Sequence, residues 1–222
     1  MKPWETLGRA RTPDGNELTL MRHPSEWAIL IDGERLMTSR MHGSEDALAR
    51  LGCERARTQA APRVLIGGLG MGYTLRAALD SLPAHAEVVV AELVPEVVQW
   101  NREYLGPLTG FPLNDPRTVI ELTDVVEVIS GSPGGFDALM LDVDNGPEAL
   151  VQEGNASLYD AAGIAMSRAS LRKGGVIAYW SVSDDPRFER RLKAAGFKVQ
   201  REHVRSRPSK RGFKHTVLLA LA

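Results

Sequence analysis

The sequence predicts an α/β fold with a mostly parallel sheet, helices on both of its faces, and a small N-terminal β appendage. Three observations lead to this prediction. From residue 63 onward, short apolar segments alternate with helical ones, which is typical of a parallel sheet covered on both faces. A glycine-rich turn joins the first apolar segment to the first helical one. Before that point, alternating polar and apolar stretches flank an Asp32-Gly33 turn, which is typical of an antiparallel hairpin.

The composition is that of an ordinary soluble domain. Of 222 residues, 43% are hydrophobic and 25% are charged, which argues against disorder. The net charge of -1 gives no global attraction for nucleic acid or an anionic membrane. A single cysteine, Cys53, excludes an internal disulfide and a multi-cysteine metal site. Without an apolar leader or a spanning apolar run, a soluble cytoplasmic protein is expected.

We expect two parts, with a boundary near residue 60. Residues 1–60 should form the appendage of about three strands, followed by a helix at 44–57 that Ser44 caps. The strands are expected at 17–22, 27–32 and 35–39.

Residues 61–222 should form the larger part, a seven-stranded sheet that ends in an antiparallel pair. The expected strands are 64–66, 87–91, 119–122, 137–141, 176–180, 199–205 and 216–222. The expected helices are 74–82, 95–104, 157–171 and 188–195.

The glycine-rich turn, residues 67–72 (GGLGMG), lies directly between a predicted strand and a predicted helix. Glycines there allow a tight turn and a close approach of the backbone to a ligand. Gly68, Gly70 and Gly72 follow the spacing G-x-G-x-G, and Tyr73 stands where a dinucleotide fingerprint needs its last glycine. The turn therefore favours a nucleoside ligand without a pyrophosphate over NAD.

Three acidic residues follow three successive predicted strands. Glu92 ends the second strand, 20 residues beyond Gly72, where a carboxylate can accept hydrogen bonds from ribose hydroxyls. Asp124 ends the third strand and could accept from an adenine amino group, and Asp142 ends the fourth. Such an acid alone is more often a helix cap or part of a solvated turn, but three at the ends of successive strands favour a binding crevice.

These residues carry a family resemblance. Residues 68–76 (GLGMGYTLR) align without a gap with G-G-G-D-G-G-T-L-R, the first loop of spermidine synthase-like proteins, and 171–176 (LRKGGV) resemble the L-K-P-G-G turn of class I S-adenosylmethionine-dependent transferases. The resemblance implies the Rossmann-like class I methyltransferase fold, whose seven-stranded sheet is mostly parallel with an antiparallel last strand. It also implies S-adenosylmethionine or its decarboxylated form as cofactor. Members of this subgroup commonly dimerise, so a homodimer is compatible with the resemblance.

The resemblance further assigns roles to residues. Glu92 matches the acid that binds the ribose, Asp124 the acid beside the adenine, and Asp142 the first acid of a D-S-S-D-P loop. Asp142 is then the expected base, with Asp144 or Tyr159 as positioning groups. The cofactor contacts that it implies are Gly68, Leu69, Gly70, Met71, Gly72, Glu92, Leu93, Asp124, Val125 and Asp142, with no metal ligand.

The departures from the subgroup concern the substrate. Met71 stands where spermidine synthases carry an acid that helps to hold the cofactor amine, and Asn145 replaces the second acid of the loop, although Asp144 is adjacent. The motif of the appendage (Q-x-T-x-x-D-E, then Y-H-E) is not recognisable in 35–47. A dicationic diamine needs several carboxylates. We therefore expect methyl transfer from S-adenosylmethionine to a small-molecule acceptor, with aminopropyl transfer as one alternative and a non-catalytic nucleoside-binding protein as another.

Two further features admit two interpretations each. The segment 201–214 has six Lys or Arg residues and one acid, and is either a solvated hairpin or a basic rim that attracts an anionic substrate. It lacks the aromatic pattern of a base-stacking surface, so nucleic acid is not expected as the partner. His42, with Glu45, either lines the acceptor pocket or is structural. Trp27, Trp100 and Trp180 are expected in the core, and Tyr179 or Trp180 at the border of the pocket.

Overall fold

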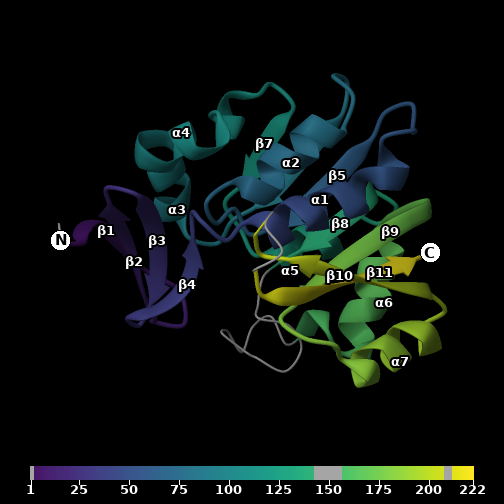
Figure 1. The fold of residues 1–222 in the computed structure, drawn as a ribbon. Coiled ribbons are helices and arrows are strands. Elements are labelled where there is room, and N and C mark those ends of the chain that lie inside the picture. The colour runs from purple at the N-terminus through teal and green to yellow at the C-terminus, as the bar shows by residue number, and fades with distance from the viewer. Residues whose placement is uncertain (1–2, 143–156, 208–211) are drawn as a thin grey trace.

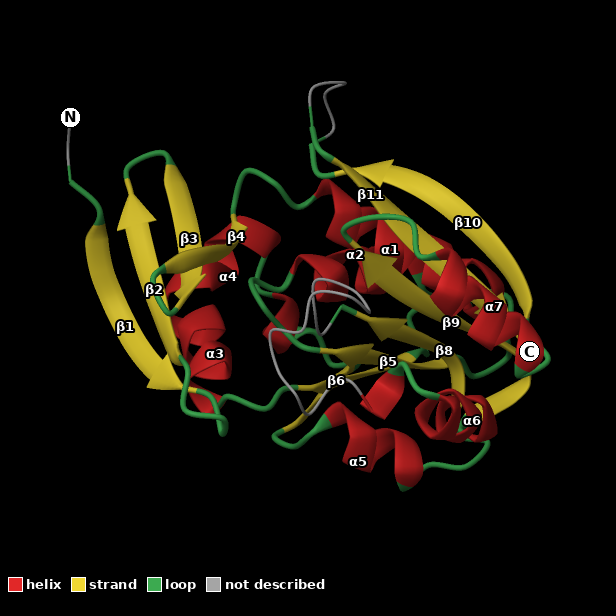
Figure 2. Ribbon diagram, turned by 90° about the horizontal axis from the view of Figure 1, so that it is seen from below, coloured by secondary structure: helices red, strands yellow, loops and turns green. Residues whose placement is uncertain are grey.

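The structure is a computed structural model that describes residues 3–142, 157–207 and 212–222. Within these residues the chain forms a four-stranded antiparallel sheet and a seven-stranded mixed sheet, with helices around the larger one (Figure 1). Figure 2 shows the smaller sheet standing beside helices α3 and α4, at one end of the molecule.

The smaller sheet contains the predicted hairpin. Asp32 and Gly33 both have positive φ, 49° and 84°, as a two-residue turn between twisted strands requires. One strand, β1, escapes sequence analysis, because Leu7 and Ala10 are its only apolar residues and they do not alternate. The strands, in spatial order, are β1 (Glu5–Arg11), β2 (Glu17–His23), β3 (Glu26–Ile31) and β4 (Glu34–Thr38).

The larger sheet has the predicted α/β topology. Its strands β5 to β9 run parallel, and β11 is antiparallel to both of its neighbours, in the order β10-β11-β9-β8-β5-β6-β7. The chain leaves β5 first toward β6 and β7 and later toward β8, which creates a crevice at the carboxyl ends of these strands. The bounds are β5 (Arg63–Gly67), β6 (Glu87–Ala91), β7 (Thr118–Glu121), β8 (Phe136–Leu141), β9 (Leu171–Ser181), β10 (Lys198–Arg205) and β11 (Lys214–Leu221).

Helices cover both faces of the larger sheet. On one face lie α1 (Gly43–Ala56), α2 (Tyr73–Ser81) and α3 (Pro95–Trp100), and on the other lie α5 (Val125–Ser130), α6 (Ala161–Ala169) and α7 (Pro186–Ala194). Three short turns follow α3: η1 (Asn101–Leu105), α4 (Gly106–Thr109) and η2 (Pro112–Asn114). None of the helices in the described part of the chain has the length and apolar character needed to cross a membrane.

The two sheets share one apolar core. Leu20 and Ile29 of the smaller sheet belong to the same buried cluster as Leu48 of α1 and Ile66 of β5. A second cluster, with Tyr179 at its centre, lies under α5, α6 and α7. The expected boundary near residue 60 stays a prediction, and α1, which precedes it, packs against β8, β9 and α2.

Two helix starts differ from the prediction. Ser44 is not the cap of α1, because the helix already begins at Gly43, whose N–H donates to the Ser206 carbonyl at 2.9 Å. The Ser44 hydroxyl instead donates to Glu45 Oε2 at 2.6 Å. The helix expected at 157–171 is shorter, because Asp160 caps α6 by accepting from Gly163 N at 2.8 Å.

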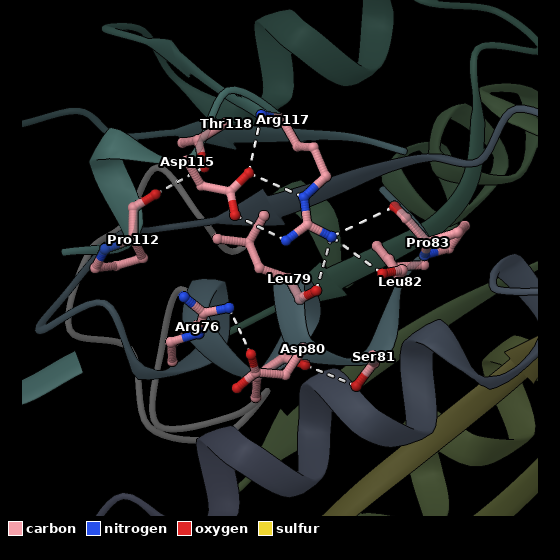
Figure 3. A network of polar contacts seen from close by, with 11 residues as sticks. Arg76, Leu79, Asp80, Ser81, Leu82, Pro83, Pro112, Asp115, Arg117 and Thr118 are labelled. Atoms are coloured by element: carbon pink, nitrogen blue, oxygen red, sulfur yellow. Dashed lines mark hydrogen bonds and ion pairs between the residues drawn. The ribbon is translucent and has the colours of Figure 1, made fainter. Parts of the chain in front are cut away.

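Arg117 links the end of α2 to the start of β7 (Figure 3). Its Nη1 donates to the carbonyls of Leu79 and Leu82, at 2.8 and 3.0 Å. Its Nη2 and Nε donate to the two carboxylate oxygens of Asp115, at 2.8 and 2.9 Å. The guanidinium thus satisfies carbonyls at a helix end that have no partner within the helix.

Candidate active site

The glycine loop connects β5 to α2 in a backbone conformation that favours glycine. Gly68, Gly70 and Gly72 have φ values of +84°, +52° and +84°. A Cβ on Gly70 would stand 2.7 Å from Met37 Cε, so the loop lies tightly against the smaller sheet. Gly68 N donates to the Ala91 carbonyl at 2.8 Å, which ties the loop to the end of β6.

Glu92 holds this loop in place from the end of β6. It is 7% exposed, its Oε2 accepts from Leu69 N at 2.8 Å, and its Oε1 accepts from Val94 N at 2.8 Å. Burial raises the pKa of Glu92, and the backbone hydrogen bonds from Val94 and Leu69 oppose that shift. Since a carboxylate oxygen accepts more than one hydrogen bond, both oxygens retain capacity for the hydroxyls of a ligand.

Asp124 caps a helix and also lines the cavity. It is the N-cap of α5, with Oδ1 accepting from Val126 N at 2.8 Å. It also lines the same cavity as Glu92 and the glycine loop. The cap fixes the direction of the carboxylate toward that cavity, so the capping role and a ligand contact are compatible.

These residues surround a cavity of about 360 Å³ at the carboxyl ends of β5, β6 and β8. Gly72 is the one predicted cofactor contact that does not line it among the described residues, because it starts α2, where a Cβ would lie 3.0 Å from Asn101 Oδ1. The predicted residues that do line it are Gly68, Leu69, Gly70, Met71, Glu92, Leu93, Asp124, Val125 and Asp142.

Met71 joins the cavity to the apolar core. Its side chain is 1% exposed and belongs to the buried cluster that the two sheets share. The cavity is therefore apolar at the place where the resemblance led us to expect an acid.

Asp142 and Glu45 form a pair of carboxyl groups in the cavity wall. Asp142 follows β8 directly, and Glu45 lies in the first turn of α1 with 9% of its surface exposed. Burial raises the pKa of Asp142 to about 8, and the charge of Glu45 adds to this shift. Burial also raises the pKa of Glu45, against the hydrogen bond from Ser44. The two groups therefore disfavour each other's ionised form.

His42 lies behind this pair. Its Nδ1 is 2.9 Å from Asp46 Oδ2, and this hydrogen bond raises its pKa. Its ring stacks on Tyr73, with centroids 4.1 Å apart and planes 8° apart. Tyr73 and Glu45 line the cavity, whereas His42 is not among the described residues that do. The structure thus favours the structural interpretation of His42.

Two predicted positioning groups have different outcomes. Asp144, like Asn145, lies outside the described residues. Tyr159 is 3% exposed and packs against the rings of Tyr179 and Phe188, in the second apolar cluster. Tyr159 is not among the described residues that line the cavity, and its role as a positioning group stays a prediction. Of the two aromatic residues expected near the pocket, Trp180 lines it and Tyr179 is buried beneath α6 and α7.

The described part of the basic segment supports the structural interpretation. Arg201 forms ion pairs with Asp184, at 2.9 Å, and with Glu189. His203 Nε2 lies 3.0 Å from Asp184 Oδ1. These contacts attach β10 to the segment around α7.

Sequence analysis missed most of the cavity wall, which comes from both ends of the chain. These residues are distant in sequence and carry no motif, so only the alternation of apolar residues in the strands could have indicated them. From the smaller sheet and the segment after it come Thr12, Leu18, Ile29, Ile31, Leu36, Met37, Thr38 and Met41, and from the C-terminal strands come Val182, Ser206, Phe213 and His215.

Comparisons with curated proteins point to one kind of enzyme. No family model matches the chain. The polyamine aminopropyltransferase of Mycobacterium tuberculosis is 27% identical over 164 residues, which cover 67% of this chain and 29% of that protein. Polyamine aminopropyltransferase 1 of Hyperthermus butylicus is 32% identical over 120 residues, which cover 52% of this chain and 39% of that protein. The chain therefore spans well under half the length of these curated relatives.

Solved structures agree on the fold. The spermidine synthase of Thermotoga maritima superposes with a TM-score of 0.73 at 20% identity, over 97% of this chain and 72% of that one. A probable spermidine synthase of Corynebacterium glutamicum superposes with a TM-score of 0.66 at 15% identity, over 100% of this chain and 81% of that one. The chain is thus similar in sequence to polyamine aminopropyltransferases, and it has the fold of the spermidine synthase structures, a mostly parallel seven-stranded sheet with an antiparallel four-stranded sheet before it.

Proposed function

We propose that the protein is an aminopropyltransferase, which moves the aminopropyl group of decarboxylated S-adenosylmethionine to an amine. The observation that carries the proposal is the meeting of Glu92, the glycine loop and Asp142 around one cavity. The curated relatives, both named as polyamine aminopropyltransferases, favour aminopropyl transfer over the methyl transfer expected from the sequence.

The residues present fit an adenosyl cofactor. A volume of about 360 Å³ lies within the range of small-molecule sites. The Glu92 carboxylate, fixed by two backbone N–H groups, offers acceptors for two ribose hydroxyls. Asp124 offers an acceptor for an amino group, and Gly68 and Gly70 let the ligand approach the backbone.

Asp142 is the residue that this proposal makes the base. When bound, the cofactor supplies an electrophilic carbon beside a sulfonium, to which the acceptor nitrogen bonds as the carbon–sulfur bond breaks. The acceptor amine must lose a proton, and a carboxylate whose pKa is raised by burial and by Glu45 takes a proton more readily than an ordinary one. Leu69 and Met71, both buried, add apolar surface to the cavity lining.

Methyl transfer from intact S-adenosylmethionine is the second candidate, and Met71 is the observation that favours it. A buried thioether cannot pair with the ammonium of the decarboxylated cofactor. The two candidates share the base and the nucleoside contacts, so they differ only in the group that is transferred.

The test is calorimetric titration with each cofactor, followed by turnover with amines and product identification by mass spectrometry. Tighter binding of the decarboxylated cofactor and an aminopropylated product are expected. Asp142→Asn should abolish turnover and leave cofactor affinity within about twofold, since the substitution keeps the shape of the side chain. Glu121→Gln, an exposed carboxylate at the end of β7, is the matched control and should change neither.

A methylated product would establish the second candidate. Binding of a cofactor with no product from any amine would indicate a non-catalytic binding protein. Full activity of Asp142→Asn would remove Asp142 from the role of base.

A further inference from the structure

The cavity has a second end, beyond the nucleoside contacts. In the ladder between β8 and β9, Leu141 pairs with Tyr179, so Asp142 and Trp180 follow as neighbours at the same edge of the sheet. On the other side of β9, Val217 pairs with Trp180, which brings His215 to this edge as well. The cavity is lined here by Asp142, Trp180 and His215, and also by Glu45 of α1.

This end carries little usable negative charge among the described residues. The carboxyl groups at this second end are those of Glu45 and Asp142. Glu92 and Asp124 line the nucleoside end instead. Burial raises the pKa of both groups, and the charge of Glu45 raises that of Asp142 further, so this end disfavours two full negative charges side by side. The nearby His215 is held neutral, since burial lowers its pKa.

Several apolar side chains that line the cavity are open to solvent. Leu36 is 39% exposed, Val182 47% and Phe213 72%, and all three line the cavity. Met37, Met41 and the ring of Trp180 line it between them. Exposed apolar side chains gathered around one opening mark a binding surface. A second ammonium placed against them would lose part of its hydration, and the described lining residues offer no further carboxylate at this end to compensate.

We infer that the acceptor has one amine and an apolar body, with the amine between Glu45 and Asp142 and the body against Leu36, Trp180, Val182 and Phe213. The inference rests on the proposed function and makes its substrate class specific. It separates this protein from an enzyme for short diamines, whose second ammonium would meet this apolar wall.

The experiment compares amines of equal length that differ in the second ammonium: butylamine with putrescine, pentylamine with cadaverine, and phenethylamine as an aromatic member. Affinity is measured by calorimetry in the presence of methylthioadenosine, which occupies the nucleoside end. Specificity is measured as kcat/KM with decarboxylated S-adenosylmethionine. We expect each monoamine to exceed its diamine at least tenfold by both measures, because its apolar chain packs against the wall where the diamine would place a partly desolvated ammonium.

A variant should reverse this preference. Val182→Asp places a carboxylate on the apolar wall just after β9, at an exposed position, and should raise the affinity for putrescine relative to butylamine at least tenfold. Leu122→Asp is the matched control, since Leu122 is 59% exposed just after β7 and is not among the described lining residues. It should leave the ratio unchanged.

Equal or tighter binding of the diamines by the unmodified protein would overturn the inference. So would the absence of binding by any amine in the presence of methylthioadenosine. If monoamines bind more tightly but no amine is converted with either cofactor, the inference about the wall is supported and the proposed reaction is wrong.

Discussion

Glu92 shows how one side chain can serve both the fold and the ligand. Its two oxygens accept from Leu69 N and Val94 N, so the carboxylate positions the glycine loop before any ligand arrives. Preorganisation of this kind lowers the entropy lost on binding. The same oxygens are the acceptors that a ribose would use, so the position should tolerate neither a shorter nor an uncharged side chain.

Replacing Glu92 with glutamine should therefore weaken cofactor binding. Glu92→Gln keeps one acceptor oxygen and puts an NH₂ group in front of a backbone N–H, so we expect the dissociation constant to rise at least tenfold, or about 1.4 kcal/mol. Calorimetric titration with S-adenosylmethionine and its decarboxylated form is the measurement. Glu121→Gln is the control, and an unchanged constant in Glu92→Gln would show that Glu92 does not contact the ribose.

The pair of Asp142 and Glu45 predicts a pH dependence of turnover. Asp142 acts as a base only when ionised, and its pKa is raised to about 8, so kcat should increase as the pH rises toward that value. Glu45→Gln removes one of the two causes of this shift, so the acid limb of the kcat profile should move to lower pH, while KM for the amine rises.

Glu54→Gln, an exposed position on the same helix, is the control for this profile. Burial is the larger cause of the Asp142 shift, so Glu45→Gln should remove only part of it. A profile that stays in place in Glu45→Gln would show that the two carboxyl groups do not interact in the working enzyme.

At the scale of elements, Arg117 connects the end of α2 to the start of β7 through its hydrogen bonds. Its side chain is 15% exposed, and it holds carbonyls of Leu79 and Leu82 together with the Asp115 carboxylate. α2 begins at the glycine loop, so this contact also supports the cavity from the far end of the helix.

We expect Arg117→Met to lower the free energy of unfolding by about 2 kcal/mol, since hydrogen bonds to a charged group are lost. Arg117 holds the pKa of Asp115 at about 2, below its usual 3.8. That contribution is full above the pKa of the unfolded state and is lost as the pH falls through about 2. The difference between the two proteins in urea denaturation should therefore shrink between about pH 4 and pH 2. Asp80→Asn, which breaks the exposed pair of Asp80 with Arg76, should have an effect below about 0.5 kcal/mol.

At the scale of the whole molecule, the smaller sheet is a wall of the site as well as an appendage. β1 approaches α3 so closely that a Cβ on Gly8 would overlap Nε1 of Trp100. This contact positions the smaller sheet, whose residues Leu18, Ile29 and Met37 line the cavity.

Gly8→Val should therefore disturb both stability and the acceptor end of the cavity. Overpacking of this kind costs about 1–3 kcal/mol, which for a chain of this size lowers Tm by about 5 °C. We expect KM for the amine and the dissociation constant of the cofactor both to rise, because the sheet contributes Leu36 to the apolar wall and packs Met37 against the glycine loop. Arg9→Val, an exposed neighbour on the same strand, is the control, and equal effects of the two substitutions on Tm would contradict the packing argument.

Most of the larger sheet could be predicted from sequence, because its strands are short apolar runs and its loop chemistry is local. Four parts of the site lie within a few residues of a strand end: the glycine loop, Glu92, Asp124 and Asp142. Their positions along the chain therefore predict that they meet at one edge of the sheet. The wall formed by Leu36, Trp180 and Phe213 depends on contacts between distant segments, which no local pattern indicates. The packing of Tyr159 could not be predicted for the same reason, because a tyrosine in an amphipathic stretch fits a pocket and a core equally well until the face of the sheet that it packs against is known.

The position of β11 has a consequence for the growing chain on the ribosome. β11 is synthesised after β9 and β10, yet it lies between them in the sheet. Until residues 214–221 have emerged, the edge of β9 is unpaired and β10 has no strand to join. A nascent chain arrested in this interval exposes a strand edge next to the apolar residues Trp180 and Val182, which is the kind of surface that chaperones recognise and that aggregates. The arrival of β11 thus joins β9 to β10 and completes this side of the cavity wall at the same moment.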